Sequence, residues 1–145
     1  MKSACKKWFW LSAAAFFLSS ATIPFMQFGS FQQENKKPAA YILAAVFWIG
    51  FILGFAFLRP VSKQRRKDRS FRDKGGIPLL RFFSNKPAMV FDILMAVGLV
   101  CLLLTFIIRT LPGWLSFAGL FALMFSIEMH GLFNGKNYVY LCDRG

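Results

Sequence analysis

Three ionisable side chains interrupt the long apolar runs of this sequence: Asp92, Glu128 and His130. A charged group inside hydrocarbon is costly, so it faces protein or water and often marks a functional site. At 1.5 Å per helical residue, Asp92 lies about 7 Å beyond Pro87, and Glu128 lies about 24 Å beyond Pro112. Because these prolines precede antiparallel runs and the hydrocarbon layer is about 30 Å thick, both acids are predicted at one level, near the same membrane surface.

Two interpretations of these residues follow. In the first, Asp92, Glu128, His130 and Asn134 form a polar cluster that binds a cation or passes protons. In the second, the acids lie within two helical turns of the membrane surface and reach water or a basic partner. We favour the second because both acids lie so close to the membrane surface; in addition, Glu128 and His130 are two residues apart and do not share a helix face. The candidate basic partners are Arg81, Lys86 and Lys136.

Motifs of soluble enzymes are missing from the sequence. A single histidine excludes a His-x-x-x-His metal motif, and no nucleophile elbow, phosphate loop or dinucleotide fingerprint occurs. The three cysteines have no paired spacing, which indicates neither a disulfide framework nor a zinc site. We therefore expect no enzymatic activity, no cofactor and no metal. The alternative is a membrane-embedded enzyme that uses Asp92, Glu128 and His130.

The composition indicates a membrane protein. Of the 145 residues, 57% are hydrophobic, 18% are aromatic and nineteen are Phe. A soluble domain is about 45–50% apolar, and a small one has too much surface to bury such an excess.

Four apolar runs have the length of membrane spans, at residues 8–28, 39–58, 88–108 and 111–133. The predicted fold is all-α: one polytopic membrane domain, residues 1–145, with four antiparallel transmembrane helices. The first run follows three lysines and contains small residues at 19–21, as a cleaved signal peptide does. It continues to Phe28, however, which is long for a signal sequence and favours a first span.

A basic loop, residues 59–86, separates the second and third spans. Basic loops stay on the cytoplasmic side, so we expect a multi-pass plasma-membrane protein with the loop and both termini in the cytoplasm. The net charge of +12 lies between apolar runs, which favours anionic lipid over nucleic acid as the partner. The charge either only sets topology or also contacts headgroups or a partner through Lys63, Arg65, Arg66, Lys67, Arg69, Arg72, Lys74 and Arg81.

The second span contains Gly50-x-x-x-Gly54. Small residues four apart let two helices approach closely. They pack either a helix of the same chain or a second copy, and we favour the same chain because four helices need internal contacts.

These features predict a small integral membrane protein that acts by association, as a subunit, regulator or immunity-type factor. Its expected partners are anionic lipids and either a second copy or another membrane protein. The alternative is a small proton- or cation-coupled transporter that uses Asp92, Glu128 and His130.

Overall fold

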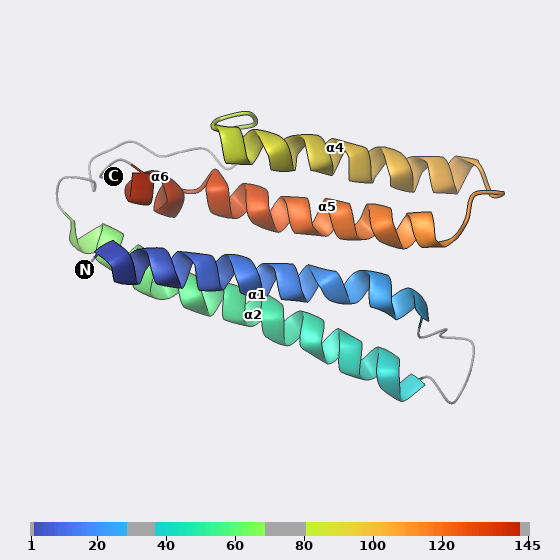
Figure 1. Ribbon diagram of the computed structural model, residues 1–145, viewed down its shortest axis with the longest axis horizontal. Helices are drawn as coiled ribbons and strands as arrows, with labels where there is room; N and C mark the ends of the chain where they lie inside the picture. The colour runs from blue at the N-terminus through green and yellow to red at the C-terminus, as the bar shows by residue number, and fades with distance from the viewer. Residues whose placement is uncertain (1, 29–36, 69–80, 143–145) are drawn as a thin grey trace.

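The computed structural model describes residues 2–28, 37–68 and 81–142, and all regular structure within these ranges is helical. Four long helices run alongside one another (Figure 1). They are α1 (Lys2–Phe28), α2 (Lys37–Lys67), α4 (Lys86–Ile107) and α5 (Trp114–Phe133). A short helix, α6 (Lys136–Cys142), follows α5.

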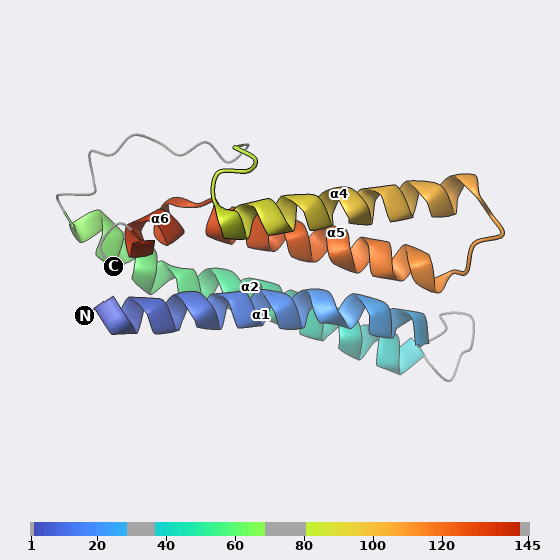
Figure 2. The ribbon, with the colours of Figure 1, turned by 45° about the horizontal axis from the view of Figure 1, so that its top comes forward.

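The long helices form two antiparallel hairpins that lie side by side as an open bundle (Figures 1 and 2). One hairpin pairs α1 with α2 and the other pairs α4 with α5, while α1 and α5 join the two. The order across the molecule is therefore α2–α1–α5–α4. Helix α6 contacts α1, α2 and α5 at the end of the molecule where α1 begins.

Burial separates inner from outer helices. Of the most apolar 18 residues in each helix, 44% are buried in α1 and 33% in α5, against 11% in α2 and in α4. The outer helices expose large apolar side chains such as Ile52 and Val100. Monomeric soluble proteins rarely expose such a continuous apolar surface, whereas helices that contact the lipid of a bilayer must be apolar on the outside. All four helices are long and apolar enough to cross a membrane, which supports the predicted all-α, multi-pass membrane protein.

The helix ends differ from the predicted spans mainly in α2, which continues to Lys67, nine residues beyond residue 58. Pro24 lies within α1 and Pro60 within α2. We call the end of the molecule where α2 and α5 finish and α4 begins the basic end. Its described basic side chains include Lys6, Lys7, Arg65, Arg66, Lys67 and Arg81.

The α1–α2 contact uses the predicted glycine pair. A Cβ on Gly50 would lie 3.0 Å from the Ala15 carbonyl oxygen, and one on Gly54 would lie 2.5 Å from the Phe16 ring. Hydroxyls of α1 bond the same stretch of α2: Ser12 Oγ donates to the Gly54 carbonyl (2.7 Å) and Ser19 Oγ to the Phe47 carbonyl (2.9 Å). Gly50 and Gly54 therefore pack against α1 of the same chain.

At the α4–α5 contact the two helix backbones themselves approach closely. A Cβ on Gly98 would lie 2.8 Å from the Leu123 nitrogen and 2.9 Å from the Gly119 oxygen. Because both atoms belong to the backbone of α5, only glycine fits at residue 98 without moving a helix. This close approach brings polar side chains of α4 and α5 together at the basic end.

Candidate functional site

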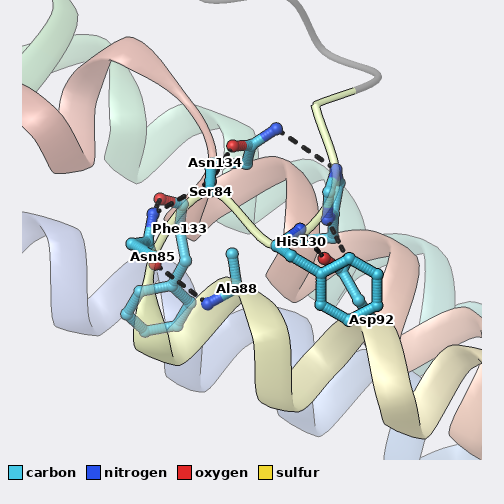
Figure 3. Close-up of polar contacts among 8 residues, drawn as sticks. Ser84, Asn85, Ala88, Asp92, His130, Phe133 and Asn134 are labelled. Atoms are coloured by element: carbon cyan, nitrogen blue, oxygen red, sulfur yellow. Dashed lines mark hydrogen bonds and ion pairs between the residues drawn. The ribbon is translucent and has the colours of Figure 1, made fainter.

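Asp92 and His130 meet between α4 and α5 near the basic end (Figure 3). His130 Nδ1 forms a hydrogen-bonded contact with Asp92 Oδ1, and the Phe83 N–H donates to Asp92 Oδ2 at 2.6 Å. Both side chains are buried, Asp92 being 3% exposed. Each carboxylate oxygen of Asp92 thus has a donor, as a buried acid needs.

The polar contacts continue from His130 along α5. Asn134 Nδ2 lies 3.3 Å from His130 Nε2, and Ser84 Oγ donates to Asn134 Oδ1. This pattern is satisfied when Nδ1 carries the proton, donating to Asp92, and Nε2 accepts from Asn134. We call Asp92, His130, Asn134, Ser84 and the Phe83 N–H the Asp92 cluster.

A tight turn before α4 closes the Asp92 cluster. Asn85 caps α4 by accepting from the Ala88 N–H at 2.9 Å. Phe83 has φ 54°, in the left-handed region that residues other than glycine rarely adopt. The Phe82 ring lies over His130, with ring centroids 5.1 Å apart. The turn therefore holds backbone strain at Phe83 while it covers His130 and supplies a donor to Asp92.

Glu128 lies on a different face of α5. Ser20 Oγ of α1 donates to Glu128 Oε2 at 2.7 Å, whereas Oε1 is buried without a hydrogen-bond partner among the described residues. The side chain is 9% exposed. Because the two residues are two positions apart, Glu128 points about 200° away from His130 around the helix. Glu128 therefore faces α1 and His130 faces α4. We call Glu128 and Ser20 the Glu128 site.

Helix direction carries the Glu128 carboxylate away from the basic end. Side chains tilt toward the N-terminus of their own helix, and α5 begins at the opposite end. The partner, Ser20, is 12 residues beyond Trp8, about 18 Å along α1. That distance exceeds half of a hydrocarbon layer about 30 Å thick.

Within the described residues neither Glu128 nor Asp92 forms an ion pair with Arg81, Lys86 or Lys136; the one ion-pair contact of Asp92 is to His130.

Of the four side chains proposed as an intramembrane cluster, Asp92, His130 and Asn134 lie together, and Glu128 lies apart. Ser20 and the Phe83 N–H were not singled out from the sequence. A signal for hydroxyl donors on α1 does exist, because Ala15 lies three residues after Ser12 and four residues before Ser19. That spacing of small residues is typical of a packed helix face.

The predicted basic surface is described in part. Lys63, Arg65, Arg66 and Lys67 lie on the last turns of α2, and Arg81 precedes the turn before α4. Arg69, Arg72 and Lys74 lie outside the described residues.

Helix α6 packs against the end of α2. Asn137 Oδ1 accepts from Arg65 Nε at 3.1 Å, and Asn137 Nδ2 donates to Ser62 Oγ at 3.1 Å. Tyr138 packs against Phe9 and Phe133. Burial, followed by its contact with Cys142, raises the pKa of the Tyr138 phenol.

An apolar groove of about 580 Å³ runs between α1 and α4, with α5 as its floor. It exists because the open helix order leaves α1 and α4 separated by α5. Trp10 and Phe17 are 60% and 51% exposed on its rim. All its lining residues are apolar: Trp10, Ala13, Ala14, Phe17, Pro87, Val90, Phe91, Phe125, Met129 and Phe133.

Comparisons with protein families, with curated proteins and with solved structures found no match to this chain. Among the described residues, no group of three or more His, Cys, Asp or Glu side chains is placed to hold a metal ion. The described residues thus offer four features to which a function can be assigned: the Asp92 cluster, the Glu128 site, the apolar groove and the basic end.

Proposed function

We propose that this small integral membrane protein acts by association with another membrane protein, as a subunit, regulator or immunity-type factor. The apolar groove between α1 and α4 is the observation that supports this proposal. Its proposed occupant is a transmembrane helix of the partner. The basic end lies in the cytoplasm, as the positive-inside rule requires, where its cations contact anionic lipid or the partner.

The groove suits a helix for two reasons. Helices associate in a bilayer through close van der Waals packing, which small residues allow. Ala13 and Ala14 provide such a surface between the large side chains of Trp10 and Phe17. Met129, with its flexible side chain, adapts readily to the shape of a neighbour. A partner helix would bury the side chains that the open helix order leaves exposed.

Photocrosslinking in native membranes tests the groove. A photoreactive phenylalanine replaces Phe17, which is 51% exposed in the groove, or Ile52, which is 61% exposed on α2 outside it. We expect one discrete protein adduct from residue 17 and none of the same mass from residue 52. Lipid adducts alone from residue 17, or identical protein adducts from both positions, would contradict the proposal.

A matched pair of substitutions tests the same groove without a crosslinker. Ala14→Trp places an indole in the groove, and Ala45→Trp places one on the exposed surface of α2. The protein that crosslinks to residue 17 is then sought by affinity purification of each variant. We expect it to be lost with Ala14→Trp and recovered with Ala45→Trp. Both variants should retain the helix content and detergent stability of the parent protein, because both positions are exposed.

Proton- or cation-coupled transport is the second candidate, and the Glu128 site supports it. A buried acid whose second oxygen has no partner among the described residues can take a proton or cation at Oε1. Asp92 has no such oxygen, because both its oxygens already have donors. Of the three residues Asp92, Glu128 and His130, this alternative therefore assigns the coupling role to Glu128.

Reconstituted vesicles with an internal pH dye test this alternative. Transport predicts a proton flux that Glu128→Gln abolishes while the folded protein stays in the membrane. Asp92→Asn serves as the comparison, since it changes an acid whose two oxygens already have hydrogen-bond donors. Absence of flux from the parent protein, or flux that survives Glu128→Gln, removes the transporter candidate and leaves association.

A further inference from the structure

A second hollow, which we call the basic pocket, lies where α2 leaves the apolar region and meets α6. It has a volume of about 670 Å³, within the range of about 300–1,000 Å³ that is usual for ligand sites. The lining has three parts: apolar Phe55 and Leu58, polar Ser62 and Asn137, and four cations. The cations are Arg59, Lys63, Arg66 and Lys67.

Helical spacing brings these cations together. Residues 59, 63 and 67 follow one another at intervals of four, and residue 66 lies three after 63 and seven after 59, which places all four on one side of α2. Among the described residues, no acid lines the pocket. Like charges on one face repel one another, so an anion in the pocket would relieve a cost that the folded chain otherwise bears.

The polar wall of the pocket is held in place. Asn137 bonds to Ser62 and to Arg65, which fixes the start of α6 against α2. Arg65 is occupied by this contact and is not a lining residue. The pocket therefore combines four cations with two polar side chains, Ser62 and Asn137, that are held in position by their contact with each other.

The position of the pocket along α2 points to a lipid. Phe55 and Leu58 belong to the predicted second span, and Arg59 is the first charged residue after it. A phospholipid has the same order of groups, with acyl chains below and the phosphate above. Phe55 is 54% exposed, so acyl chains reach it from the bilayer. A free phosphate would use the cations and leave the apolar half of the pocket without a role.

We propose that the basic pocket is a binding site for the headgroup of an anionic phospholipid. Arg59, Lys63, Arg66 and Lys67 bind the phosphate, Ser62 and Asn137 donate to it, and Phe55 and Leu58 contact the first carbons of the acyl chains. Four cations on one face favour a headgroup with two phosphates over one with a single phosphate. This inference rests on the proposed function, since it names the lipid that contacts the basic end.

Native mass spectrometry of the full-length protein in detergent tests the site. The protein is titrated with cardiolipin, phosphatidylglycerol or phosphatidylcholine. We expect one tightly bound lipid, with affinity in that order and about tenfold or more between the first and the last. Glycerol phosphate at the same concentrations should not displace cardiolipin; displacement would identify a free-phosphate site and overturn the proposal.

Two variants with equal loss of charge locate the binding. The pocket variant is R59Q/K63Q/R66Q/K67Q, and the control variant is K6Q/K7Q/R81Q/K86Q, whose residues do not line the pocket. We expect cardiolipin affinity to fall about tenfold or more in the pocket variant and less than about threefold in the control. Equal losses in both variants would show an unlocalised charge effect and overturn the proposal.

Asn137→Leu provides a test in which no charge changes. It removes the bonds to Ser62 and Arg65, so we expect about a threefold or greater loss of cardiolipin affinity with the net charge unchanged. If the pocket variant does not fold, this variant decides: full affinity in Asn137→Leu overturns the site. Neither result depends on the photocrosslinking at Phe17, so failure of the lipid site and failure of the proposed association remain distinguishable.

Discussion

The two sides of α5 make different contacts with their neighbours. Toward α4, the backbones touch at Gly98 and Gly119, and both oxygens of Asp92 have donors. Toward α1, aromatic side chains meet edge-on, as Phe17 does with Phe125, and Glu128 keeps one oxygen without a partner among the described residues. At the α4–α5 contact the backbones are thus close and both oxygens of the acid are bonded, whereas the acid on the α1 side of α5 keeps one oxygen without a partner among the described residues.

This difference separates the roles of two acids that the sequence places at a similar depth. A buried charge that makes all its hydrogen bonds helps to specify one helix arrangement. Removing one of its partners lowers the stability of the fold strongly. A buried acid with an unmade bond costs free energy in the folded state and is retained when it has another use. We therefore expect Asp92 to hold α4 and α5 together and Glu128 to matter for activity.

The largest expected effect is that of Asp92→Ala. It leaves the buried His130 Nδ1–H and the partly buried Phe83 N–H without their acceptor, which we expect to cost about 3 kcal/mol of the free energy of unfolding. SDS titration in mixed micelles measures this quantity. A loss below about 1 kcal/mol would show that the Asp92 cluster does not hold the hairpin.

Gly98→Ala tests the backbone contact next to that cluster. The added methyl group would meet the Leu123 nitrogen at 2.8 Å, and neither backbone can yield without separating α4 from α5. We expect a loss of about 1–3 kcal/mol in the same titration. Gly131→Ala is the matched control in α5, because its Cβ would have no described atom within 4 Å; equal losses in the two variants would exclude a packing cause.

Phe83→Val tests the strain in the turn that covers the Asp92 cluster. A β-branched residue tolerates φ 54° worse than Phe does, so we expect a further cost of about 1 kcal/mol. Phe83→Asn is the control, since asparagine adopts this region readily, and it should be neutral or stabilising. If valine and asparagine behave alike in the titration, the positive φ carries no cost.

Glu128→Gln is expected to have the smallest effect on stability. Its amide oxygen still accepts from Ser20 Oγ, and no ion pair within the described residues is lost, so the free energy of unfolding should change by less than about 1 kcal/mol. A loss as large as that of Asp92→Ala would show that Glu128 is structural, and the contrast between the two sides of α5 would fail.

Much of the fold followed from runs of apolar residues. Their lengths predicted four helices, because a bilayer demands about 20 apolar residues per span. The extension of α2 to Lys67 was harder to place, since charged residues such as Arg65 and Arg66 favour helix and solvated loop alike. Helix order was not predictable, because apolar faces in a membrane do not show which neighbour they meet.

The candidate site was predictable only in its residue types. Depth arithmetic brought Asp92, Glu128 and His130 to a similar level, and the two-residue spacing indicated that Glu128 and His130 face apart. The partners came from other segments: Ser20 lies 108 residues before Glu128, and the Phe83 N–H depends on a turn with positive φ. Neither contact has a local sequence signal that names its partner.

By itself the sequence determined that this protein has four helices long and apolar enough to span a membrane, because composition and run length act through the solvent around the chain. Only the tertiary structure decided which carboxylate has a hydrogen-bond donor for each oxygen, where the apolar groove opens and which cations share a pocket. Those outcomes depend on the order α2–α1–α5–α4 and on the rotation of each helix about its axis. Packing between distant segments sets the helix order and the helix rotations. The roles of residues such as Gly98 and Ser20 are therefore visible only when the neighbouring helix is known.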